Sequence, residues 1–482
     1  MKIPILRQAQ DRFSNYQLPN SNQQGSILIF VVVFMFIASL VILAVLGNAT
    51  TQLRLTRASH DKELAFHIAE AGANYYQWYL AHYPKDYSDG TGQTSCSPCG
   101  PYVHDFKDFD TNQTIGQYSL TIYPPPTGTT IVTIVSTGYT TANPKVKRVV
   151  TVKYGVPSLA QYAFLTNSSM WIGGSETVSG QLFANGGIRF DGSGNAPIQS
   201  AKSTYLCPSW SGSPCPTTKA GIWGAAPAST QAYWQYPQPS IDFSTMTTDL
   251  AAMKASAQAS GIYLAPSGGQ GYSLVFNSNG TVSIYVVSTL QSNPTGYDVN
   301  NVAHNEYVDY STRTLQSTRA LPTNGIMFVE DRTWVEGTVA GRVTVAAAKF
   351  PYNATIAPSI LIPNNVVYAA KDGTNSLGLI AQQDVLVTYH APNTLEINAA
   401  LIAQNGSAQF YYYPGVIKTS ITIYGSTASY GTWTWSWVDG GGNTISGYTN
   451  TTTVYDSNLL YGPPPSFPLS TSGYQQISWS SN

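Results

Sequence analysis

Residues 26–46 read SILIFVVVFMFIASLVILAVL and carry no charged side chain. At a rise of about 1.5 Å per residue, an α-helix of this length crosses a hydrocarbon core of roughly 30 Å. A secretory signal peptide is the alternative, but its apolar region usually covers only about 7–15 residues and ends at a small-residue cleavage site. No such site follows here, so the stretch is predicted to be a membrane-spanning helix.

The helix is predicted to continue well beyond the membrane. Apolar and aromatic residues recur at steps of three and four after the span, and the first helix-stopping residue is Pro84. The members of this stripe are Leu64, Ile68, Ala71, Tyr75, Tyr79 and His82. A single helix over 26–83 would be a rod of roughly 85 Å, with its first part in lipid and its second part carrying a globular domain.

The charges that flank the span predict its orientation. Lys2, Arg7 and Arg12 precede it with a single acid, Asp11, and positive residues favour the cytoplasmic side. The outer flank is mixed in sign, which weakens this rule without reversing it. We therefore expect residues 1–25 to be a cytoplasmic leader of a single-pass protein of the cytoplasmic membrane, with everything after the span extracytoplasmic.

The junction between leader and span carries a resemblance to a known family. The polar leader ends in Gln23-Gln24-Gly25, directly before Ser26 and the apolar helix, and this resembles the processing site of type IV prepilins. The resemblance implies that a prepilin peptidase cuts between Gly25 and Ser26 and methylates the new N-terminus. The chain departs from the main pilins at the fifth mature position, where Phe30 replaces their glutamate, and at Gln24, where a basic residue is common.

A second motif points to the minor pilins of this family. The segment AFHIAEAG spans residues 65–72, and its Ala69, Glu70, Ala71 and Gly72 resemble the signature that follows the membrane helix in PilX-type minor pilins. This implies other pilins, minor pilins, the prepilin peptidase and the pilus assembly platform as partners, besides the inner membrane. The implied function is assembly initiation or surface adhesion, at a cell-surface pilus or a related filament. Independently of the resemblance, we expect a surface or glycan ligand for the large C-terminal part of the chain, from its aromatic residues.

Two other functions stay open at this point. The chain could be a membrane-anchored surface protein unrelated to pili, or an anchored β-helix enzyme acting on polysaccharides. The size of the head favours the tip of a filament over its shaft, because helices pack about 10 Å apart in a bundle and a large head cannot repeat at that interval.

Composition predicts a turn-rich, all-β extracellular protein. Charged residues make up only 10% of the 482-residue chain, against about 25% in ordinary soluble domains. Gly, Ser, Thr, Asn and Tyr are abundant instead. The formal net charge of -1 offers no field that would hold nucleic acid, so no such partner is expected.

The cysteines form two close pairs after the span. In an exported domain these pairs predict two local disulfides, one between Cys96 and Cys99 and one between Cys207 and Cys215. A redox function of the first pair would need a βαβ context, which is absent, and the wide spacing disfavours a zinc site.

Three alternating runs after the helix predict an antiparallel meander over 84–155, packed on the outer half of the helix as in pilins. The runs are 117–123, 130–139 and 146–154, and a polar loop is expected over 84–114.

From about residue 156 the pattern changes to very short runs separated by Gly, Asn and Asp. The tetrapeptide LIAQ occurs at 379–382 and again at 401–404, a spacing that suits one coil of a parallel β-helix. Asn405-Gly406 is expected to take positive φ in the following turn. We predict a β-helix-like domain over 156–419, although a large β-sandwich would also give short strands. The fold class is thus mainly β with one long N-terminal helix.

The predicted β-helix is interrupted over about 202–300. That stretch holds a predicted helix from Ser244 to Ala259, stopped by Gly261, and a β-hairpin with strands at 272–276 and 281–287. Residues 420–482 are expected to be an aromatic-rich β or cap region. The alternating Trp433, Trp435 and Trp437 there predict a core face or cap, or else a stacking platform for a ligand.

No residue set has the spacing that catalysis or metal binding requires. The nearest candidates are Glu330-Asp331-Arg332 with Glu336, and Asp384 near His390, and a solvated turn explains both. The run Asp191-Gly192-Ser193-Gly194-Asn195 has oxygen ligands but lacks the full calcium-loop pattern. We expect no enzyme activity, no cofactor and no metal.

Overall fold

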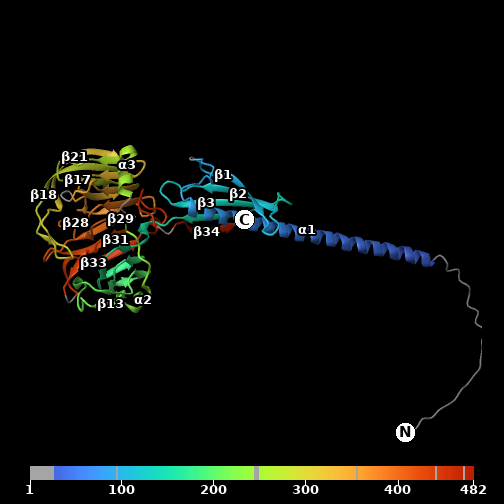
Figure 1. Ribbon diagram of the computed structural model, residues 1–482, viewed down its shortest axis with the longest axis horizontal. Coiled ribbons are helices and arrows are strands. Elements are labelled where there is room, and N and C mark those ends of the chain that lie inside the picture. The colour runs from blue at the N-terminus through green and yellow to red at the C-terminus, as the bar shows by residue number, and fades with distance from the viewer. Residues whose placement is uncertain (1–25, 94–95, 244–248, 354–356, 440–441, 471–472) are drawn as a thin grey trace, which may run out of the picture.

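Helix α1 runs without a break over Ser26–His82, as predicted, and only its C-terminal part is packed against the rest of the chain. The computed structural model describes residues 26–93, 96–243, 249–353, 357–439, 442–470 and 473–482. In it the N-terminal half of α1 projects freely from the molecule (Figure 1). Its apolar side chains are exposed, Phe30 to 72%, and its length and composition suffice to cross a membrane.

A five-stranded antiparallel sheet covers the C-terminal part of α1, in the order β1-β2-β3-β4-β34. The strands are β1 Cys99–Lys107, β2 Thr114–Tyr123, β3 Ile131–Thr140, β4 Lys147–Gly155 and β34 Gln475–Ser481. The predicted three-strand meander is therefore confirmed as β2, β3 and β4. We call the sheet and the helix part that it covers the stalk module.

Two strands of this sheet were not predicted. β1 lies inside the stretch that we expected to be a loop. It was missed because Gly100 and Pro101 interrupt the alternation of its residues, and its register against β2 shifts between Cys99 and Tyr102. β34 comes from the C-terminus and pairs with β4, more than three hundred residues earlier in the chain. Its side chains are mostly polar and all exposed, so no buried face marks it in the sequence.

The face of α1 that packs on the sheet is not quite the predicted stripe. Ile68 and Tyr79 are buried, but Leu64, Ala71 and Tyr75 are only half-buried and His82 is exposed. The buried face includes residues that the stripe left out. They are the small Ala65, Ala69, Gly72 and Ala73 and the large Tyr76 and Leu80. The same core contains Leu120, Ile122, Val132, Ile134, Val150 and Val152 of the sheet. The predicted stripe therefore ran partly beside the buried face.

The described residues between β4 and β34 form a second part, which we call the head, built largely from short strands. Many of these strands pair in parallel with strands farther along the chain, and we call each successive layer of strands a coil. The first coils supply β5 Phe164–Thr166, β6 Met170–Ile172, β7 Glu176–Ser179, β8 Leu182–Ala184, β9 Ile188–Phe190, β10 Ser193–Gly194, β11 Ile198–Ser200, β14 Ile222–Trp223 and β15 Trp234–Gln235. Corresponding strands pair in parallel from coil to coil, as β5 with β8 and β8 with β11.

A second series of coils follows later in the chain. Its strands are β16 Ile262–Leu264, β22 Ile326–Val329, β23 Thr333–Val339, β24 Arg342–Ala347, β25 Ile360–Ile362, β26 Val366–Tyr368, β27 Ser376–Ala381, β28 Val385–Val387, β29 Thr394–Ala403, β30 Ala408–Gln409, β31 Ile417–Ser429, β32 Ser436–Val438 and β33 Thr444–Tyr455. The repeated LIA segments pair in register, Leu379 with Leu401 and Ala381 with Ala403, so the predicted one-coil spacing is confirmed.

The coils are not stacked in chain order. β5 pairs with β31, and β7 pairs with β33, so the first coils join the last ones in the middle of the stack. One column of strands therefore runs β15, β11, β8, β5, β31, β29, β27, β24, β22 and β16. At about 4.8 Å between neighbouring strands the stack is roughly 45 Å long, and it runs across the direction of α1 (Figure 1).

The order of the strands shows where two of the predicted regions lie in the structure. Residues 420–482, expected to be an aromatic-rich β or cap region, supply strands to the middle of the stack and β34 to the stalk module. The interruption at 202–300 is divided between the two ends. β12 Thr204–Leu206, β13 Thr218–Ala220 and α2 Ala228–Gln231 lie at one end, while α3 Asp249–Ser260 and β17 lie at the other (Figure 1). Residues 238–243, which we call the crossing segment, run along the stack, since Gln238 is hydrogen-bonded to Ser200 of β11 and Ile241 to Asn185, which follows β8.

The remaining local predictions fare as follows. β17 Gly271–Asn277 and β18 Thr281–Gln291 form the predicted antiparallel hairpin, extended by β21 Asp309–Ala320. β19 Gly296–Tyr297 pairs with β20 Ala303–His304. Within the described ranges, short 3-10 turns cover Leu159–Gln161, Ser209–Ser211 and Ser457–Leu459. The described part of α3 begins at Asp249, so the predicted N-cap Ser244 lies outside the described residues.

The prediction for Gly406 was wrong in its reason. Neither Asn405 nor Gly406 is among the described residues with positive φ. A Cβ at Gly406 would instead lie 2.3 Å from Asp384 Oδ1 and 2.6 Å from the carbonyl oxygen of Gln383. Glycine is required there because Gln383 and Asp384 of the preceding coil approach closely.

Candidate functional site

The N-terminal part of α1 is the first candidate functional surface. α1 begins at Ser26, the residue that would follow the predicted cut, whereas Gly25 lies outside the described residues. Phe30 is exposed, and the first turn contains no acidic residue. The described part of the molecule supplies no cover for this apolar surface, which therefore needs lipid or other helices around it.

The motif at 69–72 packs the helix on the sheet. Ala69 is fully buried, and a Cβ at Gly72 would lie 2.4 Å from Ser136 Oγ. Glu70 is half-exposed and pairs with His67, Oε2 to Nδ1 at 3.3 Å, one turn earlier. An exposed pair of this kind contributes about 0–1 kcal/mol. The motif's small residues thus let helix and sheet approach closely, while its acid lies on the surface.

Both predicted disulfides are present in the structure, Cys96 with Cys99 and Cys207 with Cys215. Cys99 is the first residue of β1. The second disulfide closes a loop between β12 and β13, and the carbonyl oxygens of Ser211 and Ser213 in this loop accept hydrogen bonds from Arg189 Nη1 at 2.5 and 3.5 Å. The loop is therefore fastened to the coils.

The residues that we considered for catalysis do not converge. Glu330 pairs with Lys254, and Asp331 accepts hydrogen bonds from the backbone and hydroxyl of Ser267. Glu336 is held by Arg313, whose Nη1 lies 2.6 Å from Oε1. These partners lie on different elements, so the carboxylates do not form one acid pair.

The two residues of the second candidate set, Asp384 and His390, bind different partners. His390 Nδ1 lies 3.1 Å from Asp309 Oδ2, whereas Asp384 accepts a hydrogen bond of 2.7 Å from the backbone nitrogen of Ser407. In the run 191–195, the Asp191 carboxylate accepts hydrogen bonds from Arg189 and Trp171. Within the described ranges no group of three or more His, Cys, Asp or Glu side chains is placed to hold a metal ion.

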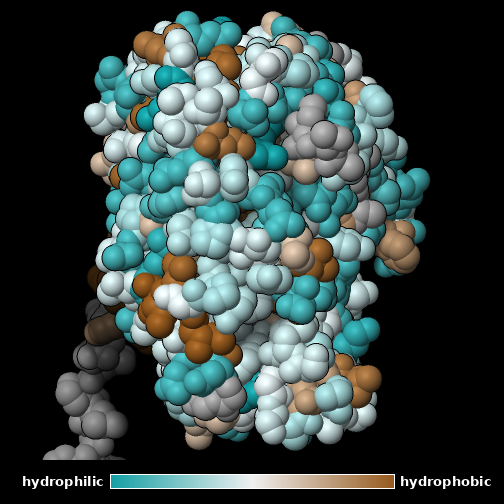
Figure 2. Space-filling view, turned by 90° about the vertical axis from the view of Figure 1, so that its left-hand side faces the viewer, coloured by the Kyte–Doolittle hydropathy of each residue, from teal (hydrophilic) through white to brown (hydrophobic). Residues whose placement is uncertain are grey.

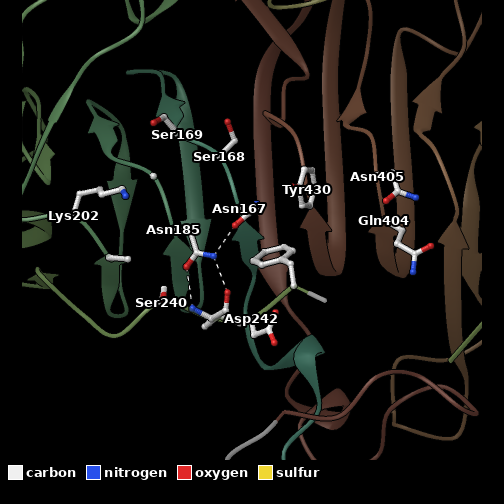
Figure 3. A pocket seen from close by; sticks show the side chains of 14 residues that line it. Asn167, Ser168, Ser169, Asn185, Lys202, Ser240, Asp242, Gln404, Asn405 and Tyr430 are labelled. Carbon is white, nitrogen blue, oxygen red and sulfur yellow. Dashed lines mark hydrogen bonds between the residues drawn. The ribbon is translucent and has the colours of Figure 1, made fainter. Parts of the chain in front are cut away.

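A polar groove on the head is the second candidate site (Figure 3). It encloses about 1030 Å³ and lies where strands of one column end, so that turns of successive coils meet along it. Asn167 follows β5, Asn185 follows β8, and Tyr430 follows β31. On the other side the groove is closed by residues 240–243, part of the crossing segment.

Hydrogen bonds fix this crossing segment to the coils. Asn185 Nδ2 donates to Asn167 Oδ1 and to the carbonyl oxygen of Ile241, both at 2.7 Å, and Asn185 Oδ1 accepts from the backbone nitrogen of Ile241 at 2.9 Å. Asn405 Nδ2 donates to the carbonyl oxygen of Gln382 at 2.8 Å. The groove wall is thus rigid and rich in amides.

The chemistry of the groove suits an uncharged, hydroxyl-rich ligand. Its lining is amides and hydroxyls, with Lys202 and Asp242 giving one charge of each sign. Tyr430 is 48% exposed and presents an aromatic ring beside them. Sequence reasoning missed this groove because its residues belong to turns far apart in the chain. The three tryptophans proposed as a platform do not line it, and Trp433 and Trp435 are buried in the core of the head.

Comparison with known proteins adds little. No protein-family model matches the chain, and no curated protein matches it. Among solved structures, the chain is similar to the competence-associated pilin ComZ from Thermus thermophilus at 12% sequence identity and a TM-score of 0.29, over 88% of this chain and 98% of that one. A TM-score this low does not establish a common fold.

Proposed function

We propose that this chain is a minor pilin-like component of a type IV pilus or a related filament, anchored in the cytoplasmic membrane by α1. The observation that carries the proposal is the division of one unbroken helix: residues 27–46 expose apolar side chains, while one face of residues 65–80 is buried under an antiparallel sheet. Such a helix can lie in lipid before assembly and among the helices of neighbouring subunits afterwards.

Processing by a prepilin peptidase is the first step of this proposal. Removal of the leader would free the amine of Ser26 at the start of α1. We expect mature protein from the native host to begin at Ser26 with a methylated N-terminus. Intact-mass measurement tests this, and Gly25→Leu should block the cut but leave membrane insertion intact, because insertion depends on the apolar run. Recovery of the full-length chain only would favour a membrane-anchored protein unrelated to pili.

Placement at the filament tip is the second step. A glutamate at the fifth mature position can pair in the apolar core with the N-terminal amine of the preceding subunit, and an unpaired charge there would be costly. Phe30 offers only apolar contact, so this chain cannot pair with the amine of a preceding subunit. Its own Ser26 amine can still pair with the glutamate of the subunit added below it. The head, roughly 45 Å across the direction of α1, also exceeds the spacing of about 10 Å between packed helices.

Counting heads on purified filaments tests tip placement. Labelled heads of the unmodified protein should form one cluster at one end, and labels spaced along the shaft would contradict the proposal. Phe30→Glu should let copies enter the shaft as far as the head allows. Phe34→Glu is the matched control: Phe34 is as exposed, at 73%, but lies one turn farther from Ser26, so it should gain no shaft entry.

We further propose that the head gives the filament an adhesive end whose surface or glycan ligand lies in the polar groove. The supporting observation is the ring of Tyr430 beside a neutral, amide-rich wall. Tyr430→Ala should lower the binding of filaments to glycan-coated surfaces severalfold. Tyr123→Ala is the control, since Tyr123 is 43% exposed on the stalk module. Equal losses in both variants would exclude the groove.

A further inference from the structure

A smaller cavity of about 230 Å³ lies on another side of the head, beneath the loop closed by Cys207 and Cys215. Its floor belongs to β6 and β9, which pair in parallel. The next strand, β14, pairs with β9 outside the cavity, so that Trp171, Arg189 and Trp223 lie in one row. Their neighbours along the strands, Met170, Ile188 and Ile222 among them, are buried in the core. The row therefore faces outward. The guanidinium carbon of Arg189 is 4.3 Å from the ring centre of Trp171 and 5.1 Å from that of Trp223.

This row is rigid and electrically balanced. Asp191 Oδ2 accepts hydrogen bonds from Arg189 Nε at 2.7 Å and from Trp171 Nε1 at 2.8 Å, while its Oδ1 accepts from the backbone nitrogen of Ala225 at 2.8 Å. Arg189 also holds the carbonyl oxygens of the disulfide loop. The loop is thus fixed as one wall of the cavity, and the ion pair adds no net charge to it.

Two polar atoms of the lining have no protein partner. Glu176 is 8% exposed and its Oε2 makes no hydrogen bond. Ser436 is half-buried, and its Oγ atom is buried and also unpaired. Buried polar atoms without partners are costly, so a bound molecule that satisfies both would be stabilised. Burial also raises the pKa of Glu176 to about 8, so its carboxyl group is protonated at neutral pH and can both donate and accept.

We propose that this cavity binds one neutral sugar ring through the carboxyl group of Glu176 and the hydroxyl group of Ser436. Neighbouring hydroxyl groups of a sugar donate and accept at once, as both protein groups do. Of the other charged residues in the lining, Arg189 is paired with Asp191, and the exposed Asp439 accepts hydrogen bonds from the backbone and side chain of Asn443. The volume corresponds to roughly eight waters at about 30 Å³ each, which is the scale of a single ring rather than of a chain.

The test uses the full-length protein in a detergent without a sugar headgroup. Saturation-transfer NMR and calorimetry should detect at least one of the methyl glycosides of glucose, galactose, mannose and N-acetylglucosamine, but neither acetate nor methylammonium. Ser436→Ala and Glu176→Leu should each weaken binding about tenfold. Glu176→Gln keeps a neutral donor and acceptor and should retain binding. Ser376→Ala is the control, because Ser376 Oγ is also buried and unpaired but lies outside this cavity.

Several results would overturn the proposal. These are no binding of any glycoside at tens of millimolar, preferential binding of acetate or methylammonium, or crystals soaked with sugar that show ordered water only in the cavity. Binding that is lost in Tyr430→Ala but kept in Ser436→Ala would place the sugar in the polar groove instead. None of these outcomes affects processing at Gly25 or tip placement, so this inference can fail independently of the proposed pilin-like function.

Discussion

Asp384 links two neighbouring coils, but its burial makes the charged form of its side chain less stable. Its Oδ1 accepts a hydrogen bond from the backbone nitrogen of Ser407 in the next coil, where Gly406 leaves room for it. Burial raises the pKa of Asp384 from 3.8 to about 6, despite this hydrogen bond. The folded state therefore binds a proton that the unfolded state has already released between about pH 4 and pH 6. Across that window, rising pH lowers the free energy of unfolding.

We expect Asp384→Asn to stabilise the head above pH 6. The amide oxygen can still accept from Ser407, and the cost of a buried charge disappears. From the pKa difference the gain at pH 7 is at most about 3 kcal/mol, and it should vanish near pH 4. Urea unfolding at both pH values measures it. Asp372→Asn is the control, since hydrogen bonds from Thr374 lower the pKa of that exposed residue. A less stable Asp384→Asn protein at pH 7 would contradict this account.

At the scale of elements, the contact between α1 and β3 depends on the absence of side chains. A Cβ at Gly138 of β3 would lie 2.2 Å from the carbonyl oxygen of Ala65 and 2.4 Å from the backbone nitrogen of Ala69. These are backbone atoms of a helix, which cannot move aside as a flexible side chain can. The small residues of the motif and the glycine of the strand therefore set the distance between helix and sheet together.

Gly138→Ala should destabilise the stalk module by roughly 1–3 kcal/mol or more, because the helix must move away from the sheet. Gly47→Ala is the matched control. Gly47 lies in the projecting part of the same helix with no atom near its missing Cβ, so this change should be neutral or slightly stabilising. Thermal unfolding in detergent, followed by near-UV circular dichroism, distinguishes the two. Equal unfolding temperatures would show that the close contact is not needed.

At the scale of the molecule, stalk module and head are joined at several points besides the chain at 156–163. Arg342 of β24 donates from Nη2 to the carbonyl oxygens of Gly128, Gly462 and Pro463 at 2.9, 2.8 and 2.6 Å. Gly128 lies in the loop between β2 and β3 of the stalk module, and the other two residues precede β34, which returns to that module.

The face of the head that points away from the stalk is mostly hydrophilic or intermediate, with hydrophobic residues in separate small groups (Figure 2).

We expect Arg342→Ala to loosen the head on the stalk. Three carbonyl oxygens lose a charged donor, at a cost of about 2–4 kcal/mol. Limited proteolysis should then cut within 124–130 and 456–470 faster than in the unmodified protein, while the head itself stays resistant. Arg319→Ala, which removes an exposed arginine of β21, should leave the cleavage rate unchanged. Unchanged cleavage in Arg342→Ala would mean that the attachment of the head to the stalk does not depend on this arginine.

Local patterns in the sequence were sufficient to determine α1, the three meander strands, the β17–β18 hairpin, both disulfides and the one-coil spacing of the LIA repeat. Each of these depends on residues close together in the chain, where hydrophobic period, turn residues or short cysteine spacing decide the structure. The leader and its cut at Gly25 also come from local sequence, but they stay a prediction, as do the domain boundaries.

Only the tertiary structure decided how these pieces are assembled. Parallel coils pair through backbone groups that are the same in every coil, so the sequence does not say that β5 adds to β31 instead of starting an end of the stack. The polar groove, the cavity at Glu176 and the return of β34 all follow from that order. Each brings together residues whose separation along the chain leaves no periodic signal, because long-range pairing is set by complementary edges and shared burial, not by local spacing.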